Sequence, residues 1–177
     1  MRTYLTTAFL AALPAAALAD YTVDMNAIDI RGVGESLGKV TITAAPQGGV
    51  TFTPRLSKLP PGAHGFHVHE FANCGARQKD GKMSAGEMAG GHWDPDKHGK
   101  HGKPGGDGHR GDLPPLEVAA DGSATQAVTA PHLKLEDLRQ KSLMIHAGGD
   151  NFSDQPKPSG GGGERIACGV IEAGAKR

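Results

Sequence analysis

The stretch Gly65-Phe66-His67-Val68-His69 predicts a β-strand with two chemically different faces. Successive side chains of a strand point to opposite sides, so Phe66 and Val68 share one face while His67 and His69 share the other. We expect the apolar face to pack into the core and the two imidazoles to lie side by side on the outer wall of a sheet. Two histidines at this spacing can bind one metal ion, but a pair of surface histidines on an edge strand would show the same pattern.

Strand-like segments continue on both sides of this stretch. They occur at residues 21–30, 39–43, 50–53, 65–71, 116–119, 125–128, 143–146 and 166–171. Glycine- and proline-rich turns separate the first of them, at residues 32–34, 46–49 and 60–62. Short strands with turns between them predict an all-β antiparallel sandwich or barrel. A short helical turn is expected at residues 133–139.

Composition narrows the class of protein. The chain has 177 residues, a length that fits one domain or at most two small ones. Its 19 Lys and Arg balance 19 Asp and Glu, so the formal net charge is zero at pH 7. That balance argues against a nucleic-acid binder and against a polybasic membrane-surface protein. With 37% apolar residues the chain is not a polytopic membrane protein, and 27 Gly with 12 Pro make long helices unfavourable.

The first 19 residues predict a signal peptide. Arg2 supplies a positive start, an uncharged stretch rich in Ala and Leu follows, and Ala17-Leu18-Ala19 has the small-x-small pattern of a cleavage site. A buried N-terminal helix is the alternative, but Pro14 would interrupt it. We expect residues 1–19 to be removed and residues 20–177 to form one exported, soluble domain.

Export affects the interpretation of the two cysteines. In an oxidising compartment Cys74 and Cys168 form a disulfide more often than two free thiols. Metal ligation by both thiolates is the competing interpretation, but the chain has no Cys-x-x-Cys spacing and offers nine histidines.

Two long segments do not follow the strand pattern, and histidines accompany both. Residues 75–113 contain four histidines, and residues 148–164, which include the glycine run 160–163, begin just after His146. Loops of this length in a compact domain are either disordered or functional, and the histidines favour function. His146 follows Leu143 and Ile145 on the opposite face of a strand, so it could join the pair on 65–69.

The donor types suggest two kinds of metal site. Three imidazoles and one carboxylate form a tetrahedral set for zinc, whereas three or four imidazoles without an acidic oxygen suit divalent copper. A solvated histidine-rich tract with loose metal affinity is the alternative for the loop.

Five motifs, in order along nearly all of the mature chain, resemble the copper/zinc superoxide dismutases. They are His64-Gly65-Phe66-His67-Val68-His69-Glu70, Ala89-Gly90-Gly91-His92-Trp93-Asp94-Pro95, Gly108-His109-Arg110-Gly111-Asp112-Leu113, Met144-Ile145-His146-Ala147-Gly148-Gly149-Asp150 and Gly163-Glu164-Arg165-Ile166-Ala167-Cys168-Gly169-Val170-Ile171. The segment Lys79-Asp80-Gly81-Lys82 and the glycine run 160–163 are similar to the exported bacterial branch. The resemblance implies an eight-stranded antiparallel Greek-key β-barrel with two long loops over the metal sites.

The resemblance also assigns roles to individual residues. It implies four copper ligands, His67, His69, His92 and His146. It implies four zinc ligands, His92, His101, His109 and Asp112, with His92 bridging the two ions. It makes Asp150 the carboxylate that links a copper-side to a zinc-side histidine, Arg165 the active-site arginine, Cys74 and Cys168 the family disulfide, and His64 a structural residue. His98 and His132 match no family position, and we expect them at the surface.

The activity implied by the resemblance is dismutation of superoxide to dioxygen and hydrogen peroxide by a redox-cycling copper. Its partner would be superoxide alone, with no nucleic acid and no membrane after signal cleavage, in a periplasmic monomer or homodimer. Lys134, Lys141 and Lys157 are candidates for a surface that attracts the anion. A noncatalytic copper/zinc-binding or copper-delivery module of the same fold is the alternative. A zinc hydrolase is disfavoured, because the fourth ligand Asp112 would close the zinc site.

Overall fold

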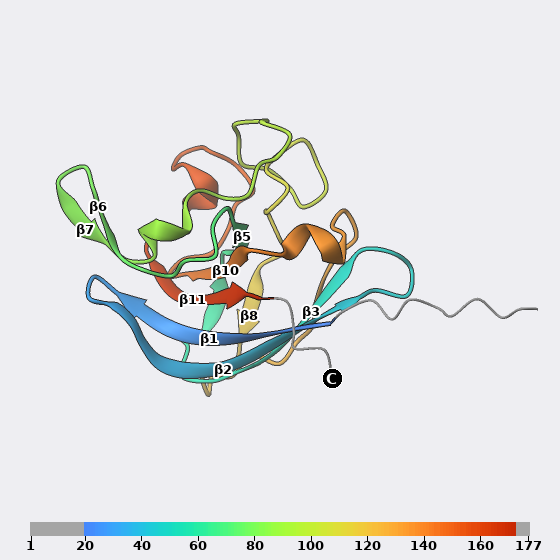
Figure 1. The fold of residues 1–177 in the computed structure, drawn as a ribbon, viewed down its shortest axis with the longest axis horizontal. Helices are drawn as coiled ribbons and strands as arrows, with labels where there is room; N and C mark the ends of the chain where they lie inside the picture. Colours follow the sequence, from blue (N-terminus) through green and yellow to red (C-terminus); the bar gives the residue numbers. More distant parts are fainter. Residues whose placement is uncertain (1–19, 173–177) are drawn as a thin grey trace, which may run out of the picture.

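Antiparallel strands form the frame of the protein, whose computed structural model describes residues 20–172 (Figure 1). The strands are β1 (Tyr21–Asp29), β2 (Gly32–Ala44), β3 (Val50–Leu56), β4 (Gly62–His64), β5 (Phe66–His69), β6 (Arg77–Lys79), β7 (Lys82–Ser84), β8 (Leu116–Val118), β9 (Val128–Ala130), β10 (Lys141–His146) and β11 (Arg165–Ile171). Three short 3₁₀-helices complete the regular structure of this part of the chain: η1 (Glu87–Ala89), η2 (Leu135–Leu138) and η3 (Ser159–Gly161). The all-β prediction is confirmed, and η2 lies where the helical turn was expected.

Seven strands share one curled sheet in the order β5-β10-β11-β1-β2-β3-β9. The first three strands in sequence are neighbours, and the last strand, β11, pairs with the first. The chain then crosses from β3 to the β4–β5 region, and crosses again from β9 to β10. Two such crossings within an antiparallel sheet are the Greek-key pattern.

A second, short pair of strands closes the sheet into a barrel. β4 pairs with β8, and Gly65 alone separates β4 from β5. Beyond β8 the backbone of Ala119 bonds to Ser123, and the next residue, Ala124, forms a bridge with Leu56 at the end of β3. Counting β4 and β5 as one interrupted strand gives the eight barrel positions that the family resemblance implies.

Alternating side chains fill the barrel. Phe52 from β3 and Phe66 from β5 meet edge to face, with ring centroids 5.8 Å apart, and both are fully buried. Val68 is also fully buried, so the apolar face of β5 packs into the core as predicted. Burial of side chains of this size supplies about 1.5 to 3 kcal/mol each and is the main stabilisation of such a fold.

The structure corrects several expectations from the sequence. His67 and His69 are fully buried rather than exposed on an outer wall, because the two long loops cover that face. β2 already begins at Gly32, where a turn was expected, and β9 lies at residues 128–130 rather than 125–128. The hairpin β6–β7 was not predicted, because its strands are almost entirely exposed and mostly polar, so they carry no apolar alternation. In Figure 1 this hairpin extends away from the barrel.

Two further points concern the ends of the chain and membranes. The expected signal peptide, residues 1–19, lies outside the described residues. Within residues 20–172, the structure contains no helix with the length and apolar character that crossing a membrane requires.

Candidate metal centre

The backbone of Val68 in β5 holds two parts of the first long loop against the barrel. Val68 N–H donates to the carbonyl of Gly111 at 2.9 Å, and its own carbonyl accepts from Trp93 N–H at 2.8 Å. Gly111 is required here, since a Cβ would lie 2.2 Å from the Val68 carbonyl oxygen. These contacts bring His92 and Asp112, which precede and follow the anchored residues, to the two histidines of β5.

Four imidazoles form the first candidate metal group. One ring nitrogen from each lies within 4.8 Å of the others in the set His67, His69, His92 and His146. Three of the rings are oriented by their second nitrogen, which contacts Asp150 Oδ2 at 2.7 Å for His67, the Gly90 carbonyl at 3.0 Å for His69 and the Gly163 carbonyl at 3.3 Å for His146. Such outer contacts fix the orientation of metal-binding histidines.

The opposite nitrogens of those three rings have no partner among the described residues. Nδ1 of His67 and Nε2 of His69 and His146 are buried and make no hydrogen bond. A buried polar atom without a partner is unfavourable, and three of them facing one another is the arrangement that a cation would satisfy. The first group therefore fits a metal ion with nitrogen ligands, as copper prefers.

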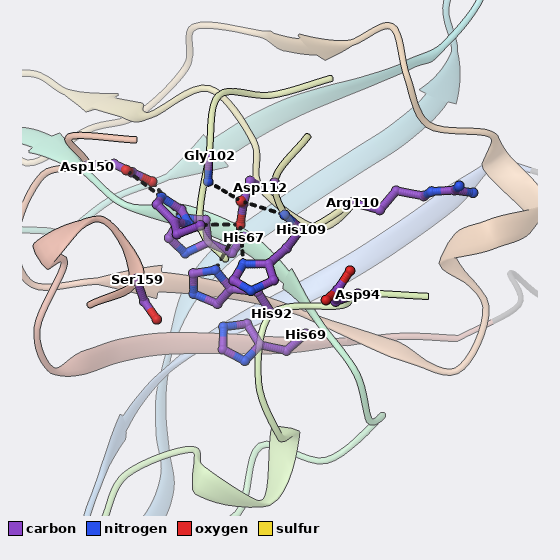
Figure 2. A network of polar contacts seen from close by, with 12 residues as sticks. His67, His69, His92, Asp94, Gly102, His109, Arg110, Asp112, Asp150 and Ser159 are labelled. Atoms are coloured by element: carbon purple, nitrogen blue, oxygen red, sulfur yellow. Dashed lines mark hydrogen bonds and ion pairs between the residues drawn. The ribbon is translucent and has the colours of Figure 1, made fainter. Parts of the chain in front are cut away.

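A carboxylate is the centre of the second candidate group. Oδ1 of Asp112 lies 2.9 Å from His92 Nδ1, 3.0 Å from His101 Nδ1 and 3.3 Å from His109 Nδ1. The second oxygen, Oδ2, accepts hydrogen bonds from the backbone N–H of Gly102 and of His109. Three imidazole nitrogens around one buried carboxylate are the donor set of a closed zinc site. Figure 2 shows this convergence on Asp112.

His92 belongs to both groups. Its Nδ1 faces Asp112, which leaves Nε2 as the nitrogen that can join the first group. In Figure 2 its ring lies between His69 and Asp112. His67 also comes within reach of the second group, but Asp150 occupies its Nε2, so only Nδ1 is free and it can serve one ion.

Asp150 joins the two groups from the opposite side. Its Oδ2 lies 2.7 Å from His67 Nε2, and its Oδ1 lies 2.8 Å from His101 Nε2. The backbone N–H of Phe152 donates to Oδ1 and fixes the carboxylate in the second long loop. One side chain therefore orients a histidine of each group.

Burial keeps the first group neutral. Desolvation lowers the pKa of His92 to about 3 and holds the pKa values of His69 and His146 well below 6.5. Desolvation also lowers the pKa of His67. An imidazole must be unprotonated at the nitrogen that binds a metal, so these directions favour ligation.

Carboxylates determine the pKa shifts in the second group. Burial alone would lower the pKa of His101, but its contacts with Asp112 and Asp150 outweigh this effect and raise the pKa to about 9. Burial alone would raise the pKa of both carboxyls, yet hydrogen bonds from the surrounding imidazoles hold each pKa far below its usual range. The negative charge of this region suits a divalent cation.

Arg165 lies at the entrance to the first group. Its Nη1 and Nη2 donate to the carbonyls of Gly86 and Gly90, each at 2.7 Å, on either side of η1. A cavity of about 440 Å³ is lined by this arginine together with His92, His146 and Lys157. A larger cavity of about 620 Å³ lies beside the disulfide and contains none of the histidines.

The disulfide between Cys74 and Cys168 is present, as the sequence predicted. It connects the loop after β5, which carries η1, to β11, which begins with Arg165. The loop that supplies the two carbonyl acceptors for Arg165 is thus tied covalently to the strand of the arginine.

The structure brings together all the predicted ligand residues, and places other predicted residues elsewhere. Of the three lysines expected to attract the anion, only Lys157 lines the cavity; Lys141 lies over the ring of Trp93 at 5.6 Å. His98 is exposed as expected, whereas His132 is half-buried and contacts the Arg110 carbonyl, so the surface expectation was wrong for it. His64 is buried between the carbonyls of His146 and Pro60.

Sequence reasoning missed Glu87 and Lys79, which line the cavity beside Arg165. Neither residue belongs to an alternating apolar pattern or to a spaced motif, because Glu87 lies in a 3₁₀ turn and Lys79 in an exposed hairpin. The acidic residue within the glycine-flanked segment 86–90 was the available signal.

Comparisons with known proteins agree with this geometry. Residues 36–171 match the family model described as copper/zinc superoxide dismutase. The chain is 58% identical over 151 residues to the protein named Superoxide dismutase [Cu-Zn] of Escherichia coli strain K12, an alignment that covers 85% of this chain and 87% of that protein.

Solved structures give the same result. The chain is similar to the Cu/Zn superoxide dismutase from Brucella abortus, with a TM-score of 0.84 and 52% identity over 86% of this chain and 99% of that one. It is also similar to the solution structure of the monomeric copper, zinc superoxide dismutase from Salmonella enterica, with a TM-score of 0.78 and 55% identity over 87% of this chain and all of that one.

Proposed function

The chain belongs to the copper/zinc superoxide dismutase family, and we propose that the two histidine groups that share His92 are the two metal sites of its reaction. The protein is an oxidoreductase that converts two superoxide ions and two protons into dioxygen and hydrogen peroxide, with copper and zinc as cofactors. A noncatalytic metal-binding or copper-delivery module is not favoured, since relatives more than 50% identical are named superoxide dismutases.

The copper ligands proposed are His67 through Nδ1 and His69, His92 and His146 through Nε2. The three buried, unpartnered nitrogens of His67, His69 and His146 are the observation that carries this assignment. No carboxylate belongs to the group, which matches the preference of copper for nitrogen donors.

The zinc ligands proposed are His92, His101 and His109 through Nδ1, together with Asp112. His67 lies near this group as well, but its single free nitrogen is needed on the copper side. His109 then completes the set, since its Nδ1 is 3.3 Å from Asp112 Oδ1. Three imidazoles and one carboxylate leave no open position for a catalytic water, which separates this site from those of zinc hydrolases.

Bound copper supplies one-electron redox chemistry, and bound zinc, which has no accessible redox change, supplies charge and fixed geometry. His92 would hold and donate a proton. Because Asp112 holds Nδ1, Nε2 is the nitrogen that could carry a proton and donate it to the substrate oxygen that becomes peroxide. Because His92 lines the cavity, the proton need not pass through the barrel.

Arg165 binds and orients the anion. The two backbone carbonyls fix its guanidinium, so the group faces the cavity without needing the substrate to position it. A guanidinium held in this way can donate charge-assisted hydrogen bonds to a small anion beside His92 and His146.

We further propose that residues 1–19 are a signal peptide and that the mature domain, residues 20–177, acts in the periplasm. The cleavage pattern at Ala17-Leu18-Ala19 and the disulfide, which is typical of an oxidising compartment, support this location. Periplasmic extraction of cells that express the full chain should release a protein that begins at Asp20. Recovery of an unprocessed chain from the cytoplasmic fraction would contradict the proposal.

Metal analysis and an activity assay on one preparation test the proposed function. The purified protein should hold one copper and one zinc per chain and should dismute superoxide, and removal of copper by a chelator should abolish turnover. His92→Ala should lose both turnover and the absorption spectrum of copper in the bridged site. Full activity of that variant would refute the bridging role.

A further inference from the structure

Glu87 is the acidic neighbour of Arg165 in the cavity that leads to His92 and His146. Its Oε2 lies 3.6 Å from Arg165 Nη1, and its Oε1 lies 3.3 Å from Lys79 Nζ. The side chains of Glu87 and Arg165 are only 11% and 14% exposed. Three charges of alternating sign therefore form a row, Lys79–Glu87–Arg165, in the wall of the cavity.

Glu87 is not required to orient the guanidinium. Two hydrogen bonds of 2.7 Å to the carbonyls of Gly86 and Gly90 already fix both terminal nitrogens of Arg165. The distance of 3.6 Å to Glu87 is too long for a hydrogen bond. The effect of the carboxylate on Arg165 is therefore chiefly electrostatic.

A fixed carboxylate at this position weakens the attraction that an anion meets. Salt screens charges removed from water less than it screens exposed ones, so the field of Glu87 acts on any anion that reaches Arg165. Lys79 opposes this field from the other side, because it pairs with the second oxygen of Glu87. Glu87 is the first residue of η1 and lies between the two glycines that accept from Arg165, so the local backbone places the carboxylate next to the guanidinium.

We propose that Glu87 is a specificity-determining residue that restrains anion binding at Arg165, and that Lys79 sets the strength of this restraint. The inference rests on the proposed function, because it places the substrate anion beside Arg165. Superoxide carries one negative charge, and dioxygen and hydrogen peroxide leave uncharged. The uncharged products leave whatever the anion affinity of the site, so the restraint acts on anions alone and keeps other inorganic anions weakly bound.

Azide binding to the holoenzyme tests the proposal with a readout independent of turnover. Azide is added to the copper- and zinc-loaded protein, and the visible absorption of copper gives its Kd. Glu87→Gln, which keeps size and removes the charge, should lower the Kd about three- to ten-fold, since each 1.4 kcal/mol of attraction is a factor of ten. The rate of dismutation should rise at low salt and fall more steeply as salt is added.

Glu164→Gln is the matched control. Glu164 lines the same cavity and, within residues 20–172, makes no ion pair with Arg165. Its substitution removes one negative charge from the cavity lining without removing an ion pair of Arg165, so the azide Kd should change less than about two-fold at ordinary ionic strength. Equal effects of the two variants would overturn the specific role of Glu87.

Further variants separate charge from structure. Glu87→Asp keeps the charge and should leave the Kd near that of the wild type, and Glu87→Ala should shift it in the same direction as Glu87→Gln. Lys79→Met should raise the Kd, and this change should shrink in the Glu87→Gln background, because the two residues then no longer interact.

Two kinds of failure are distinguishable. An unchanged or raised azide Kd in both Glu87→Gln and Glu87→Ala, with copper and zinc contents equal to wild type, would overturn the inference alone. A wild-type protein that binds copper outside the histidine groups, or that has no dismutase activity, would instead overturn the proposed function.

Discussion

His67 and Asp150 are joined by a contact of 2.7 Å between Nε2 and Oδ2, and both side chains are completely buried. The other oxygen of Asp150 reaches His101 Nε2 at 2.8 Å, so a single carboxylate orients one histidine of each metal group. The geometry of the two groups is therefore coupled on both sides, through the ring of His92 and through this carboxylate.

Asp150→Asn should weaken zinc binding about 10- to 100-fold, because an amide offers one acceptor where two imidazole N–H groups need one each. Competition against a zinc chelator measures the affinity. Asp121→Asn, which alters an exposed turn carboxylate that accepts from Ser123, is the control and should bind zinc like the wild type. Unchanged zinc affinity in Asp150→Asn would show that His101 is oriented by other contacts.

Arg165→Lys should keep both metals and lower kcat/KM about ten-fold at low salt. A lysine retains the charge but cannot donate to Gly86 and Gly90 in the planar, two-nitrogen arrangement of the guanidinium. Arg165→Glu should slow the enzyme further and flatten the dependence of the rate on salt. Wild-type kinetics in Arg165→Glu would remove this residue from the mechanism.

Removal of the disulfide in Cys74→Ser/Cys168→Ser should lower the free energy of unfolding by about 4 kcal/mol in the chain-entropy model. The bridge closes a loop of 94 positions and ties the η1 loop to β11. Urea unfolding of both proteins under oxidising conditions measures the difference. Adding reductant should lower the free energy of unfolding of the wild type towards that of the variant. If the two proteins are equally stable without reductant, the disulfide has no stabilising role.

The metal-free protein should lose stability as pH falls below 6.5. Burial lowers the pKa of His92 to about 3 and those of His69 and His146 well below 6.5, so the unfolded chain takes up protons that the folded chain does not. Stability present above pH 6.5 is thus lost between about pH 6.5 and 3, by up to about 1.4 kcal/mol per pH unit for each ring.

His101 changes stability with pH in the opposite direction. Its pKa is raised to about 9, so its contribution is complete below pH 6.5 and is lost as pH rises through 9. Because five imidazoles (the four of the first group and that of His132) have lowered pKa values and only that of His101 is raised, we expect unfolding of the metal-free protein to require less urea at pH 5 than at pH 7.5. Equal or greater stability at pH 5 would contradict the neutral, buried state of the first group.

Periodicity predicted those parts of the site that lie on strands. The alternation of 65–69 and of 143–146 assigned His67, His69 and His146 to the faces opposite the core-facing Phe66, Val68, Leu143 and Ile145. It did not predict their burial, since alternation distinguishes two faces but not whether a loop covers one of them. Most barrel strands followed from the same pattern. The ends of β2 and β9 differ from the prediction, and β4 (Gly62–His64) was not predicted, because a turn was expected at residues 60–62.

Periodicity could not predict the site residues that lie in loops. His101, His109 and Asp150 have no periodic signal and were assigned only by resemblance to the family, and their meeting depends on backbone anchors such as Gly111 against Val68. Glu87 was missed because its role arises from a contact between a 3₁₀ turn and β11, which are far apart in sequence.

Diffraction from crystals of the fully loaded protein, with anomalous data collected at the copper and zinc absorption edges, tests whether His92 bridges the two ions. We expect two separate peaks on either side of one imidazole, with copper at Nε2 and zinc at Nδ1 of His92. A loaded crystal in which that ring contacts neither ion, or only one of them, would contradict it.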